Sequence, residues 1–175
     1  VVAWSGSVRV EVRPLNDPRS PPWDQSSSGA LGTLGLAAPR PERTPPFGSP
    51  GLALVRVGLA RSPVSSHDPW LRHKTTHRAA YDQAMASRPD CEDVLLWNER
   101  GEVTETSIAN VVVWMSDGLT TPALDAGLLP GILRAEALRE GHVREGIVRV
   151  ADLAARPRMW LVSAVRGWRE AVLTP

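Results

Sequence analysis

The stretch Asp93–Glu105, DVLLWNERGEVTE, decides how this chain folds. The segments 93–97 and 102–105 are rich in strand-forming residues, and the four residues 98–101 between them end in glycine, which adopts a positive φ without strain. This pattern predicts a β-hairpin. The apolar run 109–115 follows it and predicts a third strand, closed by Ser-Asp-Gly. The centre of the chain is therefore expected to be an antiparallel sheet.

Working outward, period-two and apolar patterns predict further strands, and helical spacing predicts three helices. Strands are expected at 52–59, 146–150, 158–164 and 168–173, and helices at 75–88, 132–139 and 152–156. Residues 119–122 are expected to lead through a loop to Pro130-Gly131. Because strands outnumber helices and hairpins outnumber crossovers, the pattern favours an α+β fold over a parallel doubly wound sheet.

The first fifty residues differ in composition from the rest. A strand is predicted at 7–13, and the stretch 14–50 is rich in proline, glycine and serine, which predicts a loop or linker with Trp23 as an anchor. We therefore expect two parts, residues 1–50 as a strand plus linker and residues 51–175 as the folded domain that contains the core.

Composition excludes several classes of protein. The chain has 175 residues, of which 42% are hydrophobic, which is enough for one domain with a buried core. Its 20 basic and 19 acidic residues leave a net charge of +1, which argues against a nucleic-acid-binding protein. No apolar run is long enough to span a membrane and no leader opens the chain, so a cytoplasmic protein is expected. A single cysteine, Cys91, excludes an internal disulfide.

Lys74 is the only lysine among the 20 basic residues. Arginine cannot replace lysine where the group must lose its proton, and a free amine is what Schiff-base chemistry requires. The sequence gives only weak support for other kinds of functional site. His73 and His77 lack the further ligands of a zinc site, and the sequence contains no nucleophile elbow and no glycine-rich phosphate loop.

Three segments together match what pyridoxal phosphate needs from a protein. The segment 73–78 offers the amine of Lys74, the segment 98–110 offers carboxylates that include Glu105, and the segment 121–134 leads into a helix at Ile132. The cofactor needs a carboxylate opposite its ring nitrogen and donors for its phosphate. The helix at Ile132 has no capping side chain, so its first N–H groups are available to an anion.

These motifs resemble those of the fold-type IV pyridoxal-phosphate enzymes, which include branched-chain and D-amino-acid aminotransferases and 4-amino-4-deoxychorismate lyase. The resemblance runs from about Asp68 to the C-terminus. It is strongest to the lyase-like C-terminal domain of aminodeoxychorismate synthase fusions, through HKTTHR at 73–78, LLWNERGEVTE at 95–105 and VRGWR at 165–169. It implies the C-terminal subdomain of the D-amino-acid aminotransferase-like fold, a mixed sheet or pseudo-barrel with flanking helices. The N-terminal subdomain of that fold is expected to be missing.

The resemblance also implies roles for individual residues. Lys74 is expected to bind the cofactor covalently and to transfer the proton, and Glu105 to face the pyridine nitrogen. Asn110 is expected to brace the site, and Arg78 to face the cofactor or a carboxylated substrate. The remaining cofactor-binding positions are expected around the ring and phosphate, at Leu129, Gly131, Ile132, Leu133 and Ser163.

The expected function is that of a lyase in folate biosynthesis, which converts aminodeoxychorismate, a carboxylated amine, to 4-aminobenzoate and pyruvate. The segments after Lys74 and Glu105 differ from those of the aminotransferases, which favours the lyase. Two alternatives stay open: an aminotransferase of the branched-chain or D-amino-acid type, and a truncated domain that serves dimerisation or a synthase partner. The resemblance further implies a homodimer and an N-terminal subdomain that supplies a phosphate-binding arginine.

Overall fold

The hairpin predicted at 93–105 is the centre of the structure. The computed structural model describes residues 54–175, so the predicted strand at 7–13, the linker at 14–50 and Trp23 lie outside the described residues. Strand β2 (Asp93–Trp97) pairs antiparallel with β3 (Val103–Thr106), and Gly101 in the turn has a φ of 72°. Strand β4 (Asn110–Met115) follows directly. The predicted hairpin and third strand are confirmed.

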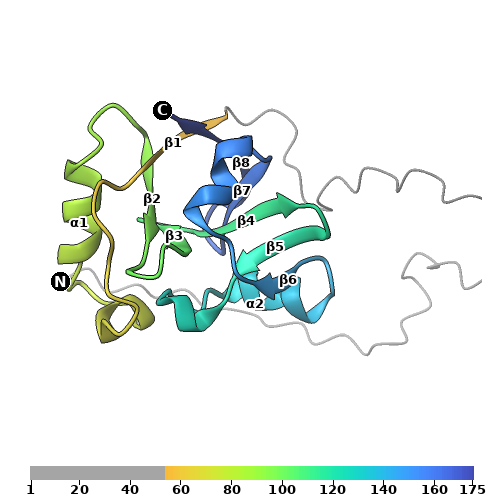
Figure 1. Cartoon of the computed structure of the whole chain (residues 1–175). Helices are drawn as coiled ribbons and strands as arrows, with labels where there is room; N and C mark the ends of the chain where they lie inside the picture. Colours follow the sequence, from red (N-terminus) through yellow and green to blue (C-terminus); the bar gives the residue numbers. More distant parts are fainter. Residues whose placement is uncertain (1–53) are drawn as a thin grey trace, which may run out of the picture. The chain divides into compact units, whose positions relative to one another are not determined.

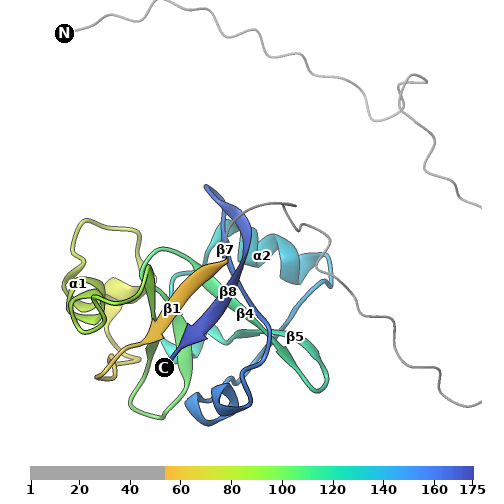
Figure 2. The same ribbon diagram turned by 90° about the horizontal axis from the view of Figure 1, so that it is seen from above.

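The strands close into a barrel. Strands β1 (Val55–Leu59), β8 (Gly167–Thr174) and β7 (Met159–Ser163) complete a ring in the order β3-β2-β1-β8-β7-β4. The ring closes because β3 also pairs with β4, through the single register pair Glu105↔Asn110. Figure 2 shows β1 and β8 side by side. The residues that close the barrel are thus two of those predicted to contact the cofactor.

Two short strands extend the sheet beyond the ring. Strand β5 (Gly118–Pro122) pairs antiparallel with β4, and β6 (Arg144–Gly146) pairs parallel with β5. Strand β1 is parallel to both β2 and β8, whereas the other neighbours in the ring are antiparallel. The sheet is therefore mixed, as expected for an α+β fold.

Two helices cover different parts of the outer surface of the barrel (Figures 1 and 2). Helix α1 (Ala79–Ala86) packs Tyr81 and Ala84 on the outer side chains of β2. Helix α2 (Ile132–Arg139) packs Ala137 on the outer side chains of β4 and β7. A third cluster, mostly valine and leucine from β1, β2, β3, β4, β7 and β8, fills the barrel. Each such side chain stabilises the fold by roughly 1.5–3 kcal/mol when fully buried.

Helix α1 begins at Ala79 instead of at residue 75, and it ends at Ala86, two residues before the predicted end. The amide of His77 donates to the hydroxyl of Thr75 at 3.2 Å, a local turn that competes with helical hydrogen bonding. Three short 3₁₀ helices connect the other elements: η1 (Pro69–Arg72), η2 (Leu124–Ala126) and η3 (Val150–Ala155).

Three other predictions need correction. The strand predicted at 146–150 is β6 at 144–146, which ends where Ile147 leaves the ladder, and the helix predicted at 152–156 is the 3₁₀ helix η3. Residues 119–122, predicted to lead into a loop, form β5 together with Gly118, because their hydrogen bonds are supplied by β4. Helix α2 begins and ends as predicted. None of the helices within residues 54–175 is long and apolar enough to cross a membrane.

Candidate active site

Glu105, at the end of β3, is the buried centre of the site, with 3% of its surface exposed. Its Oε1 accepts hydrogen bonds from the Tyr81 hydroxyl at 2.7 Å and from the Leu129 amide at 3.1 Å. Its Oε2 accepts one hydrogen bond, from Asn110 Nδ2 at 3.1 Å. A carboxylate offers about four acceptor positions. Oε2 therefore retains a position for one further donor.

Burial controls the charge of this carboxyl group. It raises the pKa of Glu105 to about 8, although the hydrogen bonds from Tyr81 and the Leu129 amide and the charges of Arg78 and Arg134 lower it. Burial also raises the pKa of Tyr81, and so does the neighbouring carboxylate. A positive charge placed next to Glu105 would favour its ionised form. The site therefore suits a ligand with a protonated nitrogen at this position.

Arg78 connects the segment that contains Lys74 to the β3–β4 turn. Its Nη2 donates to the Ser107 carbonyl at 2.7 Å, and its guanidinium lies 4.7 Å from the ring centroid of Tyr81. In this structure Arg78 thus braces the turn next to Glu105. Its predicted contact with the cofactor or substrate stays a prediction.

Lys74 lies in the segment between η1 and α1, four residues before Arg78, and its side chain is exposed. It makes no hydrogen bond or ion pair with the described residues. Four residues of extended chain span at most about 14 Å, which limits the distance from Lys74 to Arg78, whose side chain contacts the β3–β4 turn. The amine is available for a covalent link, as the prediction requires.

The segment before α2 reaches Glu105 through its backbone. Besides the Leu129 amide, the Leu129 carbonyl accepts from Asn110 Nδ2 at 2.9 Å. Gly131 leaves no room for a side chain, because a Cβ there would lie 2.1 Å from Asn110 Oδ1. Close packing against Asn110, and not backbone conformation, is therefore what requires glycine at this position.

Helix α2 begins directly after Gly131 with no side-chain cap. Ile132 is 75% exposed, and Leu133 packs partly against the cluster below the helix. The Ile132 amide has no acceptor among the described residues. As predicted from the sequence, the first turn offers unpaired N–H groups to an anion.

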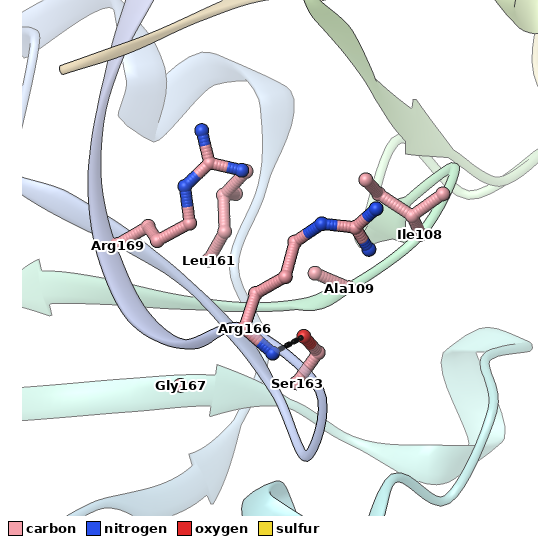
Figure 3. A pocket seen from close by; sticks show the side chains of 7 residues that line it. All are labelled: Ile108, Ala109, Leu161, Ser163, Arg166, Gly167 and Arg169. Carbon is pink, nitrogen blue, oxygen red and sulfur yellow. Dashed lines mark hydrogen bonds between the residues drawn. The ribbon is translucent and has the colours of Figure 1, made fainter. Parts of the chain in front are cut away.

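Ser163 ends β7, one residue beyond the Val162↔Asn110 pair. Its hydroxyl accepts from the Arg166 amide at 3.2 Å and lies in a small pocket at the tip of the β7–β8 hairpin (Figure 3). The structure thus brings Glu105, Asn110, Leu129 and Gly131 into contact. Lys74, Ile132, Leu133 and Ser163 lie on the adjoining segments without direct contact to Glu105.

Sequence reasoning missed two groups that hold this centre. Tyr81 is the only tyrosine in the chain and lies on the helix after Lys74, but its helical spacing gave no sign that it donates to Glu105. Asp93 Oδ1 accepts from both the amide and the hydroxyl of Ser107, at 3.1 and 2.6 Å, and so fixes the β3–β4 turn. No sequence pattern links Asp93 to Ser107, because their contact depends on the strand register.

These residues fit pyridoxal phosphate. The acceptor position on Glu105 suits a protonated pyridine nitrogen, the first turn of α2 offers donors for a phosphate, and Lys74 offers the amine. Within residues 54–175 no group of three or more histidine, cysteine, aspartate or glutamate side chains could hold a metal ion.

Comparison with protein-family models shows which family this chain belongs to. Residues 2–172 match the family model described as amino-transferase class IV. The chain belongs to this family. Class IV membership is consistent with the barrel, and solved structures of fold-type IV enzymes share the architecture of about 70% of the chain.

Individual class IV relatives carry two kinds of name. A Schizosaccharomyces pombe protein named "Putative aminodeoxychorismate lyase" is 33% identical over 123 residues, which cover 66% of this chain and 53% of that protein. A Thermotoga maritima protein named "Probable branched-chain-amino-acid aminotransferase" is 35% identical over 122 residues, covering 67% and 44%. The chain thus spans about half the length of these curated relatives.

Among solved structures, a "Putative amino-acid aminotransferase" from Mesorhizobium loti superposes with a TM-score of 0.65 at 39% identity. This match covers 70% of this chain and 60% of that one. The family is therefore established for this chain, whereas the names of the relatives divide between lyase and aminotransferase.

Proposed function

We propose that residues 54–175 form the cofactor-holding part of a pyridoxal-phosphate-dependent 4-amino-4-deoxychorismate lyase. The observation that carries this proposal is the Glu105 carboxyl group. It is buried, held by Tyr81, Asn110 and the Leu129 amide, and has one acceptor position left on Oε2. A fully satisfied structural carboxyl would leave no such position. Asn110, the donor to Oε2, also donates to the Leu129 carbonyl and packs against Gly131 at the start of α2.

Each residue of the site has a separate task in this proposal. Lys74 would hold the cofactor covalently, Glu105 would keep its ring nitrogen protonated, and the first-turn amides at Ile132 and Leu133 would bind its phosphate with Ser163. Asn110 and Gly131 position Glu105 and the start of α2. When bound, pyridoxal phosphate supplies an electron sink for the pair released at the carbon that carries the substrate amine.

Lys74 is the base of the proposed reaction. Its amine would take the proton from the amine-bearing carbon of the substrate. Cleavage of the carbon–oxygen bond to the enolpyruvyl group, followed by protonation of that group, gives pyruvate and leaves an aromatic ring, 4-aminobenzoate. Aromatisation favours the products, and no oxidant is needed. The protein therefore has only to position the substrate and move one proton.

Three sequence motifs favour the lyase over the aminotransferase. HKTTHR at 73–78, LLWNERGEVTE at 95–105 and VRGWR at 165–169 are similar to those of the lyase-like domain of aminodeoxychorismate synthase fusions. The aminotransferase remains the second candidate, because the Thermotoga and Mesorhizobium relatives carry that name. A domain that serves only dimerisation or a synthase partner is the third.

The first test concerns Lys74. Lys74→Arg keeps the positive charge but removes the only side-chain amine, so borohydride reduction in the presence of pyridoxal phosphate should leave no adduct on the folded variant. Peptide mass spectrometry locates the adduct in the wild type. His73→Gln, a change in the same exposed segment, is the matched control and should still form it. An adduct on folded Lys74→Arg at any site other than the N-terminal amine would disprove the role of Lys74.

The second test separates the candidate functions. The cofactor-loaded full chain is incubated either with aminodeoxychorismate or with a branched-chain amino acid and 2-oxoglutarate. The lyase releases equal amounts of 4-aminobenzoate and pyruvate, whereas the aminotransferase releases glutamate and a branched-chain keto acid. A chain that forms the Lys74 adduct but gives neither set of products would support the third candidate.

A further inference from the structure

The turn of the central hairpin contains an arginine that the proposed mechanism does not use. Arg100 lies between β2 and β3, and its guanidinium contacts three other residues. Nη1 donates to the Ser66 hydroxyl at 2.8 Å, and Nη2 donates to the Asp125 carbonyl at 2.9 Å. Nε donates to Glu102, also at 2.9 Å. Because Ser66 precedes η1 and Asp125 lies in η2, Arg100 joins the segment before η1 to the segment before α2.

Neighbouring contacts hold the same two segments together. Glu99 accepts from the Ser66 amide at 2.8 Å and from the Ser66 hydroxyl at 2.6 Å, and Ser66 is fully buried. Asn98 donates to the Ala126 carbonyl at 3.0 Å. Gly127 lies directly against Ser66, because a Cβ at Gly127 would lie 2.8 Å from Ser66 Cα. Residues 66, 98–100 and 125–127 thus form one packed junction.

On one side the junction is linked to Lys74. The chain between Ser66 and Arg72 folds back on itself, because the Arg72 side chain donates to the Ser66 carbonyl at 3.3 Å. Leu71, in the same stretch, is buried. Lys74 follows Arg72 by two residues, which span at most about 7 Å when extended. A shift of Ser66 would therefore move the start of the segment that contains Lys74.

On the other side the junction is linked to the start of α2. Leu129 follows Gly127 by two residues, and its amide donates to Glu105 while its carbonyl accepts from Asn110. The path from the junction into α2 is thus fixed at both ends. A shift of Asp125 would therefore disturb the approach to the first turn of α2.

We propose that Arg100 is a positioning residue that sets the spacing between Lys74 and the first turn of α2. This inference rests on the proposed function, in which Lys74 holds the aldehyde end of pyridoxal phosphate and α2 binds its phosphate end. When one molecule is held at both ends, the strength of the second attachment depends on how well the spacing of the two sites matches the molecule. Loss of Arg100 should weaken a ligand held at both ends and spare a ligand held at one.

The test compares three probes by absorbance and fluorescence titration of the full chain. Pyridoxal 5′-phosphate can use both ends, pyridoxal lacks the phosphate, and pyridoxine 5′-phosphate lacks the aldehyde. Arg100→Gln should weaken binding of pyridoxal phosphate by about tenfold, the effect of losing one charge-assisted hydrogen bond, and should change the other two by less than about twofold. Arg158→Gln is the matched control and should change none, because Arg158 pairs with Glu170 at the β7–β8 hairpin.

Ser66→Ala removes the same contact from its other end and should by itself show the same selective weakening. The double variant should lose no more than Arg100→Gln alone, because both changes remove one interaction. Three results would overturn the inference: unchanged binding of pyridoxal phosphate in both single variants, equal weakening of all three probes, or additive losses in the double variant. Equal weakening would mean that Arg100 supports only the fold, which circular dichroism and urea denaturation of each variant also report.

Amide hydrogen exchange of the cofactor-free chain tests the junction itself. Arg100→Gln should speed exchange in peptides that cover residues 64–72 and 123–129, and should leave the β7–β8 hairpin unchanged. Unchanged exchange in both peptides would also overturn the inference. The borohydride adduct at Lys74 is scored on the wild type. Its absence would defeat the proposed function, whereas an adduct on the wild type without selective weakening in the variants would defeat only the role of Arg100.

Discussion

The two helices contribute to the Glu105 centre by different chemical means. Helix α1 and the residue before it contribute side chains, the hydroxyl of Tyr81 and the guanidinium of Arg78. Helix α2 and the segment before it contribute backbone, namely the Leu129 amide and the unpaired first-turn amides. The contribution of α1 therefore depends on the identity of individual side chains. The α2 side depends on the path of the chain, and only Gly131 is constrained by its lack of a side chain.

Gly131→Ala should disrupt the α2 contribution to the Glu105 centre most strongly. The added Cβ would meet Asn110 Oδ1 at 2.1 Å, and Asn110 cannot move away without losing its hydrogen bonds to Glu105 and Leu129. Overpacking of this kind costs about 3 kcal/mol in free energy of unfolding, measured by urea denaturation. Ala135→Gly, which shortens a side chain later in the same helix, should cost about 1 kcal/mol. Equal losses for the two variants would contradict the tight contact at Gly131.

A second variant removes one backbone donor without changing the helix. Ile132→Pro deletes the amide of the first helical residue, and proline is favoured at that position. Gly131 already has the extended conformation that a following proline requires, with φ −67° and ψ 143°. Loss of one hydrogen bond to a charged group should weaken binding of pyridoxal phosphate by about 2 kcal/mol.

The same variant should leave binding of pyridoxal, which has no phosphate, unchanged. Ile132→Ala keeps the amide and is the control for the lost side chain, which is 75% exposed. Absorbance titration gives the affinities. If the proline variant bound both cofactor forms as the wild type does, the first turn of α2 would not be the phosphate site.

The third prediction uses the charge of Glu105, to which both helices contribute. Its pKa rises from 4.5 in the unfolded chain to about 8 in the folded one. Between these values the folded state holds a proton that the unfolded state has lost, so the free energy of unfolding falls as the pH rises through this window. For one proton the slope is at most about 1.4 kcal/mol per pH unit.

Glu105→Gln should remove this slope between about pH 5.5 and pH 8, as measured by urea denaturation at several pH values. Glu99→Gln is the matched control. Hydrogen bonds from the Ser66 hydroxyl and amide lower the pKa of Glu99 to about 2, so Glu99 is charged in both states above about pH 5.5. Its variant should run parallel to the wild type across the same range. A Glu105→Gln curve that also ran parallel would show that Glu105 titrates normally.

The smallest expected effect tests the α1 side. Tyr81→Phe keeps the ring under Arg78 but removes the hydroxyl that donates to Glu105 Oε1. The Leu129 amide still donates to that oxygen, so the loss should be about 1 kcal/mol in free energy of unfolding. Because the lost hydrogen bond lowered the pKa of Glu105, that pKa should rise further, which ¹³C NMR titration of the carboxyl group detects. A lower pKa would contradict the assigned hydrogen bond.

Much of the local structure could be predicted from the sequence. The hairpin at 93–105, the strand that follows it and the helix beginning at Ile132 have local signals: alternation, a turn glycine and helical spacing. Lys74 was singled out because it is the only lysine, and Glu105 because its motif resembles that of a family, and their roles toward a cofactor stay predictions. These features depend on residues close together in the chain.

Only the tertiary structure decided how the centre is held. The bond from Tyr81 to Glu105, the anchoring of Ser107 by Asp93 and the contact between Gly131 and Asn110 join residues 14–24 positions apart. Their geometry is set by closure of the barrel through the pair Glu105↔Asn110. Local sequence patterns carry no information on such register, because a strand can alternate in the same way whichever partner it has. The acceptor position left on Glu105 is therefore a property of the closed barrel.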